Sequence, residues 1–420
     1  MASNKTLSNA KKAKKDEFYT QLVDIENELV HYKEHFKNKV VLCNCDDPYE
    51  SNFFKYFAAN FNHLGLKKLI ATCYDPSPIA GRQLDIFSQG ILSKTERRAF
   101  KIEIKEVIDA NNDGAINLSD VEYLIKNDRN VLSLLEGNGD YKSKECEMLL
   151  DESDIVVTNP PFSQLNDYVL FLYKHNKKFL VMCNHNVVHY TEIFPLIKNN
   201  ELWLGYNSNK TVKFAMPDYY EKWDEIIDGV KYGKVPSIGW ITNLDIKKRH
   251  EDLILYKIYN EIDYPKYENL NAIDVERVSE IPCDYYGVMG VPDTFLDQYN
   301  PMQFEVLGAD GIPRYAEELH MGRIGEDWLS RYRKNGGTGH YTANMKSLVI
   351  TRDGVPKKPY SRILIRRRKP TGDVVETCHG ASLQGEHPKP YEQPENTLPL
   401  AAEDEIPYNN PKDVLHTSSK

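Results

Sequence analysis

One short segment constrains this chain more than any other part of its sequence. Residues 154–158 form a mostly apolar, β-branched run, and Asn159, Pro160 and Pro161 follow it directly. A run of this kind predicts a buried strand of a parallel sheet, and two consecutive prolines cannot continue its hydrogen-bond ladder. Asn159 and Phe162 are therefore expected just beyond the carboxyl end of the strand, where open α/β sheets bind their ligands.

The residues after this predicted strand fit one chemical task. The side-chain oxygen of Asn159 and the carbonyl oxygen of Pro160 can both accept hydrogen bonds from one exocyclic amine. Two acceptors orient the lone pair of that NH2 group and stabilise the positive charge that develops as the nitrogen attacks an electrophile. Phe162 offers an apolar face for a base. Asn-Pro and Pro-Pro are also ordinary turn dipeptides, but after an apolar strand and before an aromatic residue they favour an aminomethyltransferase site for a nucleobase.

This segment resembles motif IV of S-adenosylmethionine-dependent amino-methyltransferases. Residues 16–21 (DEFYTQ), 43–48 (CNCDDP) and 239–245 (GWITNLD) resemble the corresponding parts of the EcoRI-type adenine-specific DNA methyltransferases. The resemblance covers roughly residues 16–370 and leaves residues 371–420 outside it.

The resemblance implies an α/β protein with a Rossmann-like class I methyltransferase sheet and a smaller C-terminal target-recognition region. The implied reaction transfers a methyl group from S-adenosylmethionine to N6 of an adenine that is flipped out of double-stranded DNA. The implied catalytic residues are Asn159, Pro160, Pro161 and Phe162. Only the resemblance implies that the target base is adenine rather than cytosine, because two hydrogen-bond acceptors can bind the exocyclic amine of either base. An RNA or a protein glutamine as methyl acceptor is the alternative.

The order of the motifs implies domain boundaries. The Phe-Tyr-Thr sequence before residue 21 resembles motif X, and because it precedes the other motifs the order is gamma-like, with target recognition at the C-terminal side. We expect four parts, with their bounds as follows: a flexible basic arm in residues 1–15, the catalytic domain in residues 16–250, the DNA target-recognition region in residues 251–370, and an acidic, proline-rich disordered tail in residues 371–420.

The residues expected to bind the cofactor lie next to predicted strands. In the resemblance, motif X covers the methionine moiety, and an acidic-aromatic pair before motif IV contacts the adenine. Acidic residues after the first two predicted strands, 39–45 and 67–73, would hold the ammonium group or sugar hydroxyls. A helix N-cap or turn chemistry explains several of the same residues, and no glycine-rich turn follows the first strand. The expected cofactor residues are Phe18, Tyr19, Thr20, Cys45, Asp46, Asp47, Asp75, Asp140 and Tyr141.

The formal net charge of −9 argues against a nucleic-acid partner until its distribution is considered. Residues 311–370 hold fourteen Lys and Arg against five Asp and Glu, whereas residues 371–420 hold three against nine. The first fifteen residues add five lysines. The acidic C-terminal end therefore makes the net charge of the chain negative, although the segment before it is basic enough to bind DNA.

Two basic clusters are candidates for DNA contact. One opens a predicted helical stretch at 247–249, and the other surrounds a predicted hairpin turn at Asp353-Gly354, with strands at 346–351 and 362–366. Arginines there can reach phosphates or guanine edges, although a solvated helix face or a charged edge strand has the same composition. The candidates are Lys247, Lys248, Arg249, Arg352, Lys357, Lys358, Arg362, Arg366, Arg367 and Arg368.

Residues 109–120 follow the spacing of a calcium loop, with oxygen-bearing side chains at positions 1, 3, 5, 9 and 12 and Gly114 at position 6. Position 12 is Asp120 rather than a bidentate Glu, and the loop occurs once. A turn that leads into a capped helix explains the same residues. We expect no metal site, and a calcium-dependent interaction module without catalysis is the non-enzymatic alternative.

The seven cysteines are scattered and form no Cys-x-x-Cys pair, which predicts reduced thiols in a cytoplasmic protein. No apolar run approaches the roughly 18 residues that a membrane helix needs, and the lysine-rich start lacks the apolar segment of a secretory signal. We expect double-stranded DNA as the partner, no membrane and a monomer. A cognate restriction endonuclease, where one exists, is not expected to form a stable complex.

Overall fold

The computed structural model describes most of the chain. The described residues are 19–45, 51–74, 99–110, 118–127, 131–216 and 223–369. All of them belong to one compact unit. The expected basic arm (1–15) and acidic tail (371–420) lie outside the described residues.

The centre of the fold is a mixed sheet. Among the described residues it holds eleven strands in the order β1-β9-β11-β7-β6-β2-β3-β4-β5, with β8 and β10 also paired to β11. Four neighbouring strands, β3, β2, β6 and β7, are parallel, and the strands that flank them, β4 and β11, run antiparallel. The strands are β1 (Tyr19–Thr20), β2 (Val40–Cys43), β3 (Lys68–Thr72), β4 (Phe100–Ile104), β5 (Leu132–Leu134), β6 (Ile155–Thr158), β7 (Lys178–Asn184), β8 (Trp203–Leu204), β9 (Lys210–Met216), β10 (Glu225–Ile227) and β11 (Val230–Thr242).

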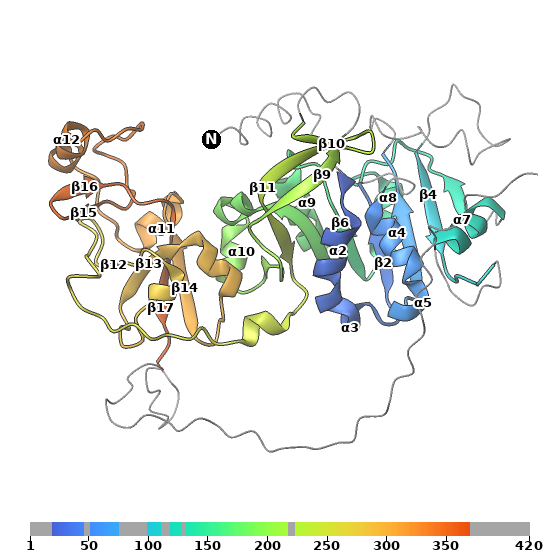
Figure 1. Ribbon diagram of the computed structural model, residues 1–420, viewed down its shortest axis with the longest axis horizontal. Coiled ribbons are helices and arrows are strands. Elements are labelled where there is room, and N and C mark those ends of the chain that lie inside the picture. Colours follow the sequence, from blue (N-terminus) through green and yellow to red (C-terminus); the bar gives the residue numbers. More distant parts are fainter. Residues whose placement is uncertain are drawn as a thin grey trace, which may run out of the picture. The chain divides into compact units, whose positions relative to one another are not determined.

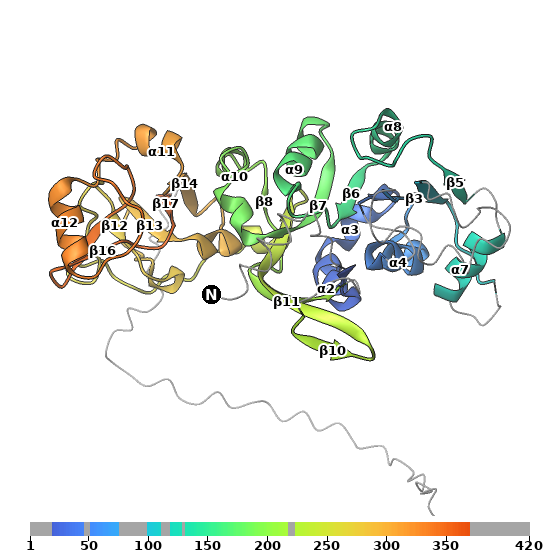
Figure 2. The same cartoon turned by 90° about the horizontal axis from the view of Figure 1, so that it is seen from above.

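The parallel strands are apolar on both faces, as their β-branched sequences predict. Successive residues of β6 point to opposite faces, so Val156 packs into one apolar core while Ile155 and Val157 pack into another. Helices α8 and α9 cover the first face, and α2, α3, α4 and α5 cover the second (Figures 1 and 2). This sheet between two helical layers confirms the expected Rossmann-like α/β fold.

Serine side chains cap two of the helices that flank the sheet. Ser51 accepts a hydrogen bond from the N–H of Phe54 at the start of α4, and Ser143 accepts one from the N–H of Cys146 at the start of α8. The helices in the described residues up to 250 are α2 (Leu22–Leu29), η1 (Val30–Tyr32), α3 (Lys33–Phe36), α4 (Asn52–Ala59), α5 (Phe61–Leu64), α7 (Leu118–Asn127), α8 (Lys144–Glu152), α9 (Leu165–Lys174), η2 (His185–His189), α10 (Phe194–Lys198) and η3 (Lys247–His250).

The residues that follow the main sheet form a second sheet in the order β12-β13-β17-β14, and a separate hairpin of β15 and β16. The elements of this part are β12 (Ile273–Asp274), η4 (Val278–Glu280), β13 (Val288–Pro292), η5 (Asp293–Gln298), β14 (Phe304–Ala309), α11 (Pro313–Glu318), α12 (Glu326–Lys334), β15 (Ile350–Arg352), β16 (Val355–Lys357) and β17 (Arg362–Arg367).

The predicted hairpin is correct in its turn and wrong in its strands. Asp353 and Gly354 form the turn, with φ of +50° and +75°, the conformation that a two-residue hairpin turn requires. They join β15 to β16. The predicted partner, residues 362–366, lies instead in β17, between β13 and β14. Burial explains the difference. Residues 363–365 are all buried, so their strand lies inside a sheet rather than in an exposed two-stranded hairpin.

Five cysteines are free thiols, as expected: Cys43, Cys45, Cys73, Cys146 and Cys183. Cys283 is disulfide-bonded, so the expectation of a reduced thiol is wrong for this residue. Scattered cysteines carry no pairing information in the sequence. In the described part of the chain, no helix has both the length and the apolar character needed to cross a membrane.

Candidate active site

Asn159 lies directly after β6, at the carboxyl edge of the parallel strands, and only 6% of its surface is exposed. Its side-chain nitrogen donates a hydrogen bond to Thr20 Oγ1 at 3.3 Å. Thr20 belongs to β1, and its carbonyl oxygen accepts a hydrogen bond from Asn52 Nδ2 at 2.7 Å. Two segments that carry the family resemblance, 16–21 and 154–163, therefore meet at this edge of the sheet.

The end of β2 is fixed to the end of β6. Thr158 Oγ1 donates to the carbonyl oxygen of Asn44, and the hydroxyl of Tyr168 in α9 donates to Asn44 Oδ1. Cys45 follows with a φ of +75°, a left-handed conformation that is rare outside glycine. Cys45 thus makes the sharp turn for which dinucleotide-binding folds use glycine.

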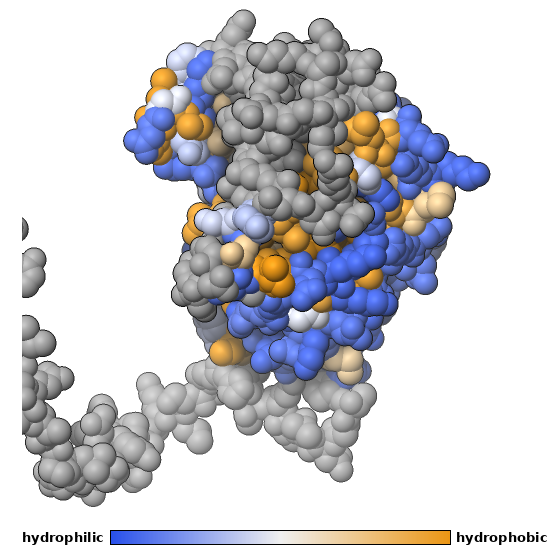
Figure 3. Space-filling view, turned by 90° about the vertical axis from the view of Figure 1, so that its right-hand side faces the viewer, coloured by the Kyte–Doolittle hydropathy of each residue, from blue (hydrophilic) through white to orange (hydrophobic). Residues whose placement is uncertain are grey.

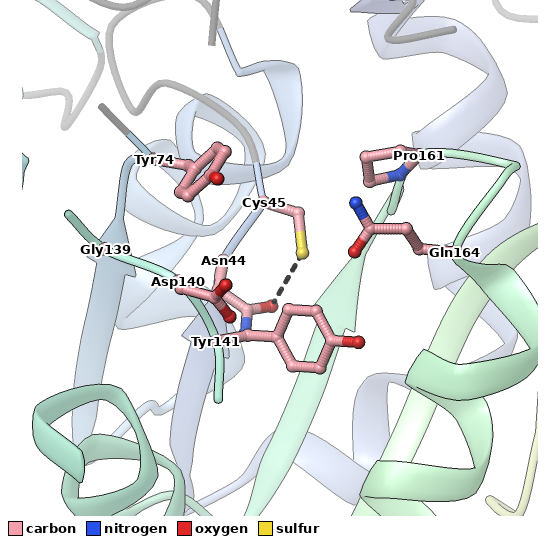
Figure 4. A pocket seen from close by; sticks show the side chains of 8 residues that line it. All are labelled: Asn44, Cys45, Tyr74, Gly139, Asp140, Tyr141, Pro161 and Gln164. Atoms are coloured by element: carbon pink, nitrogen blue, oxygen red, sulfur yellow. Dashed lines mark hydrogen bonds between the residues drawn. The ribbon is translucent and has the colours of Figure 1, made fainter. Parts of the chain in front are cut away.

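A pocket opens beside these strand ends (Figure 4). Its volume is about 470 Å³ when the solvent at its mouth is included. The residues after β2, β3 and β6 contribute to it, together with the turn before α8. The lining residues are Asn44, Cys45, Tyr74, Gly139, Asp140, Tyr141, Pro161 and Gln164.

Gly139 brings the turn before α8 against the end of β3. Its φ is +77°, and a Cβ built on it would lie 2.0 Å from the carbonyl oxygen of Cys73 and 3.0 Å from the Cβ of Ala99. Both the conformation and the close contact therefore require glycine. This contact places the next two residues, Asp140 and Tyr141, in the wall of the pocket.

Local contacts hold Asp140 and Tyr141 in place. Asp140 Oδ1 accepts a hydrogen bond from the N–H of Lys142 at 2.8 Å. The Tyr141 ring packs edge-on against Tyr168 at 5.0 Å and Phe171 at 5.1 Å. Burial raises the pKa of the Tyr141 hydroxyl well above its ordinary value, so the phenol stays neutral. A carboxylate beside aromatic rings suits a heterocyclic ligand that carries an amine or hydroxyls.

The structure brings several predicted site residues together. Cys45, Asp140, Tyr141 and Pro161 line the pocket, whereas Thr20 contacts Asn159. The side chain of Tyr19 and the residues Phe18, Asp46, Asp47 and Asp75 lie outside the described part.

The aromatic residue of the catalytic segment occupies an unexpected place. The Phe162 side chain is buried and meets Phe214 edge-on at 6.3 Å, within the apolar core on one side of the sheet. The ring face that the sequence suggested for base stacking is therefore turned into the core in this conformation. Pro160 is also buried.

Four pocket residues were not predicted from the sequence: Asn44, Tyr74, Gly139 and Gln164. Asn44 and Tyr74 follow β2 and β3 closely, as Asn159 follows β6. Because the carboxyl ends of parallel strands share one edge, this position in the sequence was a usable signal. Gln164 lies close behind the two prolines and had no such signal.

Several basic side chains predicted to contact DNA form ion pairs inside the protein. Arg352 and Arg362 both pair with the buried Asp274, at 2.7 and 3.0 Å. Lys358 pairs with the buried Asp310 at 2.8 Å. A charge that loses its water costs folding free energy unless it is paired. The two carboxylates therefore explain how these basic side chains lie inside the protein.

Other basic candidates are held by backbone or aromatic groups. Arg367 is buried and donates to the carbonyl oxygen of Cys283, and the Arg249 guanidinium lies 3.6 Å from the centre of the Trp203 ring. Arg368 Nε donates to the carbonyl of Pro301, and Lys248 Nζ donates to that of Tyr206. The candidates that remain well exposed are Lys247, Lys357, Arg366 and Arg368.

The described part of the calcium-like loop fits the turn-and-helix alternative. Asp120 is buried in the first turn of α7, and its Oδ1 accepts a hydrogen bond from the N–H of Ala110 at 2.9 Å. Residues 111–117 of the loop lie outside the described part. Among described residues, no group of three or more His, Cys, Asp or Glu is placed to hold a metal ion.

Comparison with known proteins extends over nearly the whole chain. The family model of the adenine-specific methyltransferase EcoRI matches residues 6–368. It begins ten residues before the resemblance found in the sequence and ends near the same place. The match therefore includes part of the segment that the sequence assigned to a flexible arm. No solved structure matches significantly.

Three curated relatives are similar to this chain. The Type II methyltransferase M.EcoRI of Escherichia coli is 47% identical over 313 residues, which cover 73% of this chain and 89% of the relative. M.MpnI of Mycoplasma pneumoniae is 39% identical over 71% of this chain and 84% of its own length. M.MgeORF184P of Mycoplasma genitalium is 38% identical with the same two coverages.

Proposed function

The chain belongs to the family of the adenine-specific methyltransferase EcoRI, and we propose that it is a site-specific DNA methyltransferase of a modification system. It transfers a methyl group from S-adenosylmethionine to the N6 amino nitrogen of an adenine in double-stranded DNA. One observation carries this proposal: Asn159 lies at the carboxyl edge of the sheet, and Pro161 of the same segment lines a pocket that offers a carboxylate and aromatic rings.

We assign the pocket to S-adenosylmethionine, which supplies an electrophilic methyl group when bound. The Asp140 carboxylate can accept a hydrogen bond from the amine of the cofactor's adenine, and the rings of Tyr141 and Tyr74 can border that base. Gly139 supports this assignment because its contact with β3 leaves the two following residues facing the pocket. The further proposed cofactor contacts are Phe18, Tyr19, Cys45, Asp46, Asp47 and Asp75. Thr20, which the sequence placed among them, is assigned instead to positioning Asn159.

The catalytic groups are hydrogen-bond acceptors at the end of β6. Asn159 Nδ2 donates to Thr20, so we assign Oδ1 of the same carboxamide as the acceptor for the amine of the target adenine. Oδ1 is buried in this conformation, so entry of the base has to uncover it. The Pro160 carbonyl is the second acceptor. Together they direct the nitrogen lone pair and stabilise the positive charge on the nitrogen as it gains the methyl group. The nitrogen then loses a proton to water, so no strong general base is needed. Pro161 and Phe162 shape this segment, with Phe162 anchored in the core against Phe214.

The substrate base is buried inside a duplex, so it has to be flipped out before it can reach Asn159. We propose residues 16–250 as the catalytic domain and residues 251–370 as the region that recognises the DNA target. Exposed cations such as Lys357 and Arg366 are suited to phosphate contact.

The methyl acceptor is tested by incubating the protein with tritium-labelled S-adenosylmethionine and, in parallel, with duplex DNA, RNA or protein extract. We expect label in DNA, recovered as N6-methyladenine after hydrolysis. Label in RNA or in protein glutamine, with none in DNA, would contradict the proposal. Methylation-sensitive sequencing of DNA from an expressing host then gives the recognition sequence.

A further inference from the structure

The main sheet has an extension that the proposed catalytic chemistry does not use. The pairing of β11 with β7 runs from Ile238 to Thr242, and Ile238 lies opposite Asn184, the last residue of β7. Residues 230–237 therefore continue beyond the carboxyl edge on which Asn159 lies. With β9 and β10 they form an antiparallel ribbon that projects from the sheet (Figures 1 and 2).

The end of this ribbon exposes large apolar side chains. Asp228 and Gly229 form the turn between β10 and β11, and the adjacent Ile226, Ile227 and Val230 are 54, 44 and 41% exposed. Figure 3 shows the ribbon projecting at the upper left, with hydrophobic and hydrophilic side chains side by side. Polar residues are usual around such turns, and exposed apolar strands promote aggregation. The apolar tip therefore points to a partner.

The apolar residues lie on both faces of the ribbon. Ile227 and Val230 are directly opposite each other on one face, whereas Ile226 points to the other face, opposite Lys231. A ribbon that packs on a protein surface needs apolar residues on one face only. A tip that is apolar on both faces suits insertion between two flat surfaces, as when apolar side chains enter a base step and unstack it.

We propose that the β10–β11 hairpin is a wedge that enters the DNA duplex and occupies the space left by the flipped adenine. This inference rests on the proposed function, because it requires duplex DNA as the substrate. Flipping a base breaks its pairing and stacking. Apolar side chains that fill the gap replace part of the lost contact and so favour the flipped state.

The ribbon is connected to the candidate catalytic segment through β9, which pairs with both β11 and β1. Thr20, Phe214 and Gly233 lie level with one another across these three strands, and Thr20 contacts Asn159. Val230 lies three residues further along the ribbon, which is about 10 Å at ~3.4 Å per residue. This reach is similar to the roughly 8.5 Å depth of the major groove. The tip of the hairpin can therefore lie inside the duplex while the flipped base lies at Asn159.

Cationic residues accompany the apolar tip. Lys213 and Lys234 lie directly opposite each other on β9 and β11, and Lys231 Nζ lies 4.3 Å from the centre of the Trp223 ring. Glu225 pairs with Lys213 at 2.6 Å. Glu225 offsets the charge of Lys213, so Lys231 and Lys234 are the cations of the ribbon that we expect to meet DNA phosphates on either side of an inserted tip.

The test compares a hairpin variant, Ile226→Ser/Ile227→Ser, with a control variant, Ile108→Ser/Met148→Ser. The control removes two apolar side chains that are 54 and 63% exposed elsewhere on the surface. Single-turnover methyl transfer is measured on two duplexes that carry the sequence methylated in host DNA. One duplex is fully paired, and the other has an abasic site opposite the target adenine, which makes flipping easier.

We expect the hairpin variant to be at least about tenfold slower than wild type on the paired duplex and within about twofold of it on the abasic duplex. The control variant should match wild type on both. A hairpin variant that is as fast as wild type on the paired duplex, or equally slow on both, overturns the wedge while the proposed function stands. If wild type methylates neither duplex, the proposed function fails and the wedge fails with it.

Discussion

The side-chain nitrogen of Asn159 lies 3.3 Å from the hydroxyl oxygen of Thr20, a residue 139 positions away in the sequence. The Thr20 hydroxyl in turn donates to the sulfur of Met182 at 3.5 Å. Because the donor half of the carboxamide is held by Thr20, the acceptor half has a fixed direction. Thr20 is therefore a positioning residue for the proposed catalytic acceptor.

Replacing this hydroxyl tests the positioning role. Thr20→Val removes the acceptor for Asn159 Nδ2 with little change in volume, and we expect the methyl-transfer rate to fall about tenfold, the worth of one hydrogen bond. The affinity for S-adenosylmethionine, measured by calorimetry, should stay the same, and Thr20→Ser should behave as wild type. A weaker cofactor affinity with an unchanged transfer rate would instead place Thr20 in the cofactor site.

A pair of neighbouring glycines tests the pocket. Gly139→Ala puts a Cβ against the Cys73 carbonyl at a positive φ, so we expect S-adenosylmethionine to bind at least about tenfold more weakly. Gly137→Ala is the control, because no atom lies within 4 Å of its added Cβ. Equal affinities for the two variants in calorimetric titrations would show that the cofactor binds elsewhere.

The stability of the protein should depend on pH through Asp297. Burial raises the pKa of this carboxyl from 3.8 to about 6, so its ionisation costs folding free energy that is absent below about pH 3 and complete above about pH 7. Asp297→Asn removes this cost. The variant should gain stability over wild type as pH rises from about 3 to 7, by up to about 3 kcal/mol. Urea unfolding at both ends of this range measures the gain, and a gain independent of pH would refute the assignment.

Two arginines of β17 should behave differently. Arg362 is buried against Asp274 at 3.0 Å, so Arg362→Ala leaves a buried carboxylate with one cation fewer and should cost about 3–5 kcal/mol in unfolding. Arg366 is exposed, and Arg366→Ala should change stability by less than about 0.5 kcal/mol.

DNA binding tests whether the exposed Arg366 contacts a phosphate. Arg366→Ala should weaken binding and lower the dependence of the affinity on salt, if Arg366 contacts a phosphate. Fluorescence anisotropy at several salt concentrations measures this slope. An unchanged slope would remove Arg366 from the proposed DNA contacts.

The catalytic strand could be predicted from the sequence because an apolar run that stops at two prolines leaves few alternatives. Its neighbours β2 and β3 were predictable because each is an apolar run followed within a few residues by polar or acidic side chains, and their shared edge located the site. The contact between Thr20 and Asn159 was different, because nothing in the spacing of residues so far apart pairs them. The motif resemblance named both segments without showing that they touch.

Burial of polar and aromatic groups was the main source of error. Arg362 and Arg366 look alike in the sequence. Arg362 is buried and pairs with the Asp274 carboxylate, which comes from another strand. Phe162 looks like a stacking platform beside a polar turn, yet Phe214 from β9 draws its ring into the core. Such outcomes depend on which strands become neighbours, and that is decided by long-range packing.

Methyl transfer depends most on Asn159 as the hydrogen-bond acceptor for the target amine. Its most direct test is single-turnover methylation of duplex DNA by Asn159→Ala, with cofactor affinity measured on the same preparation. We predict a loss of at least about 10²-fold in the transfer rate and a dissociation constant for S-adenosylmethionine within about twofold of wild type. A variant that methylates adenine at the wild-type rate would contradict the account.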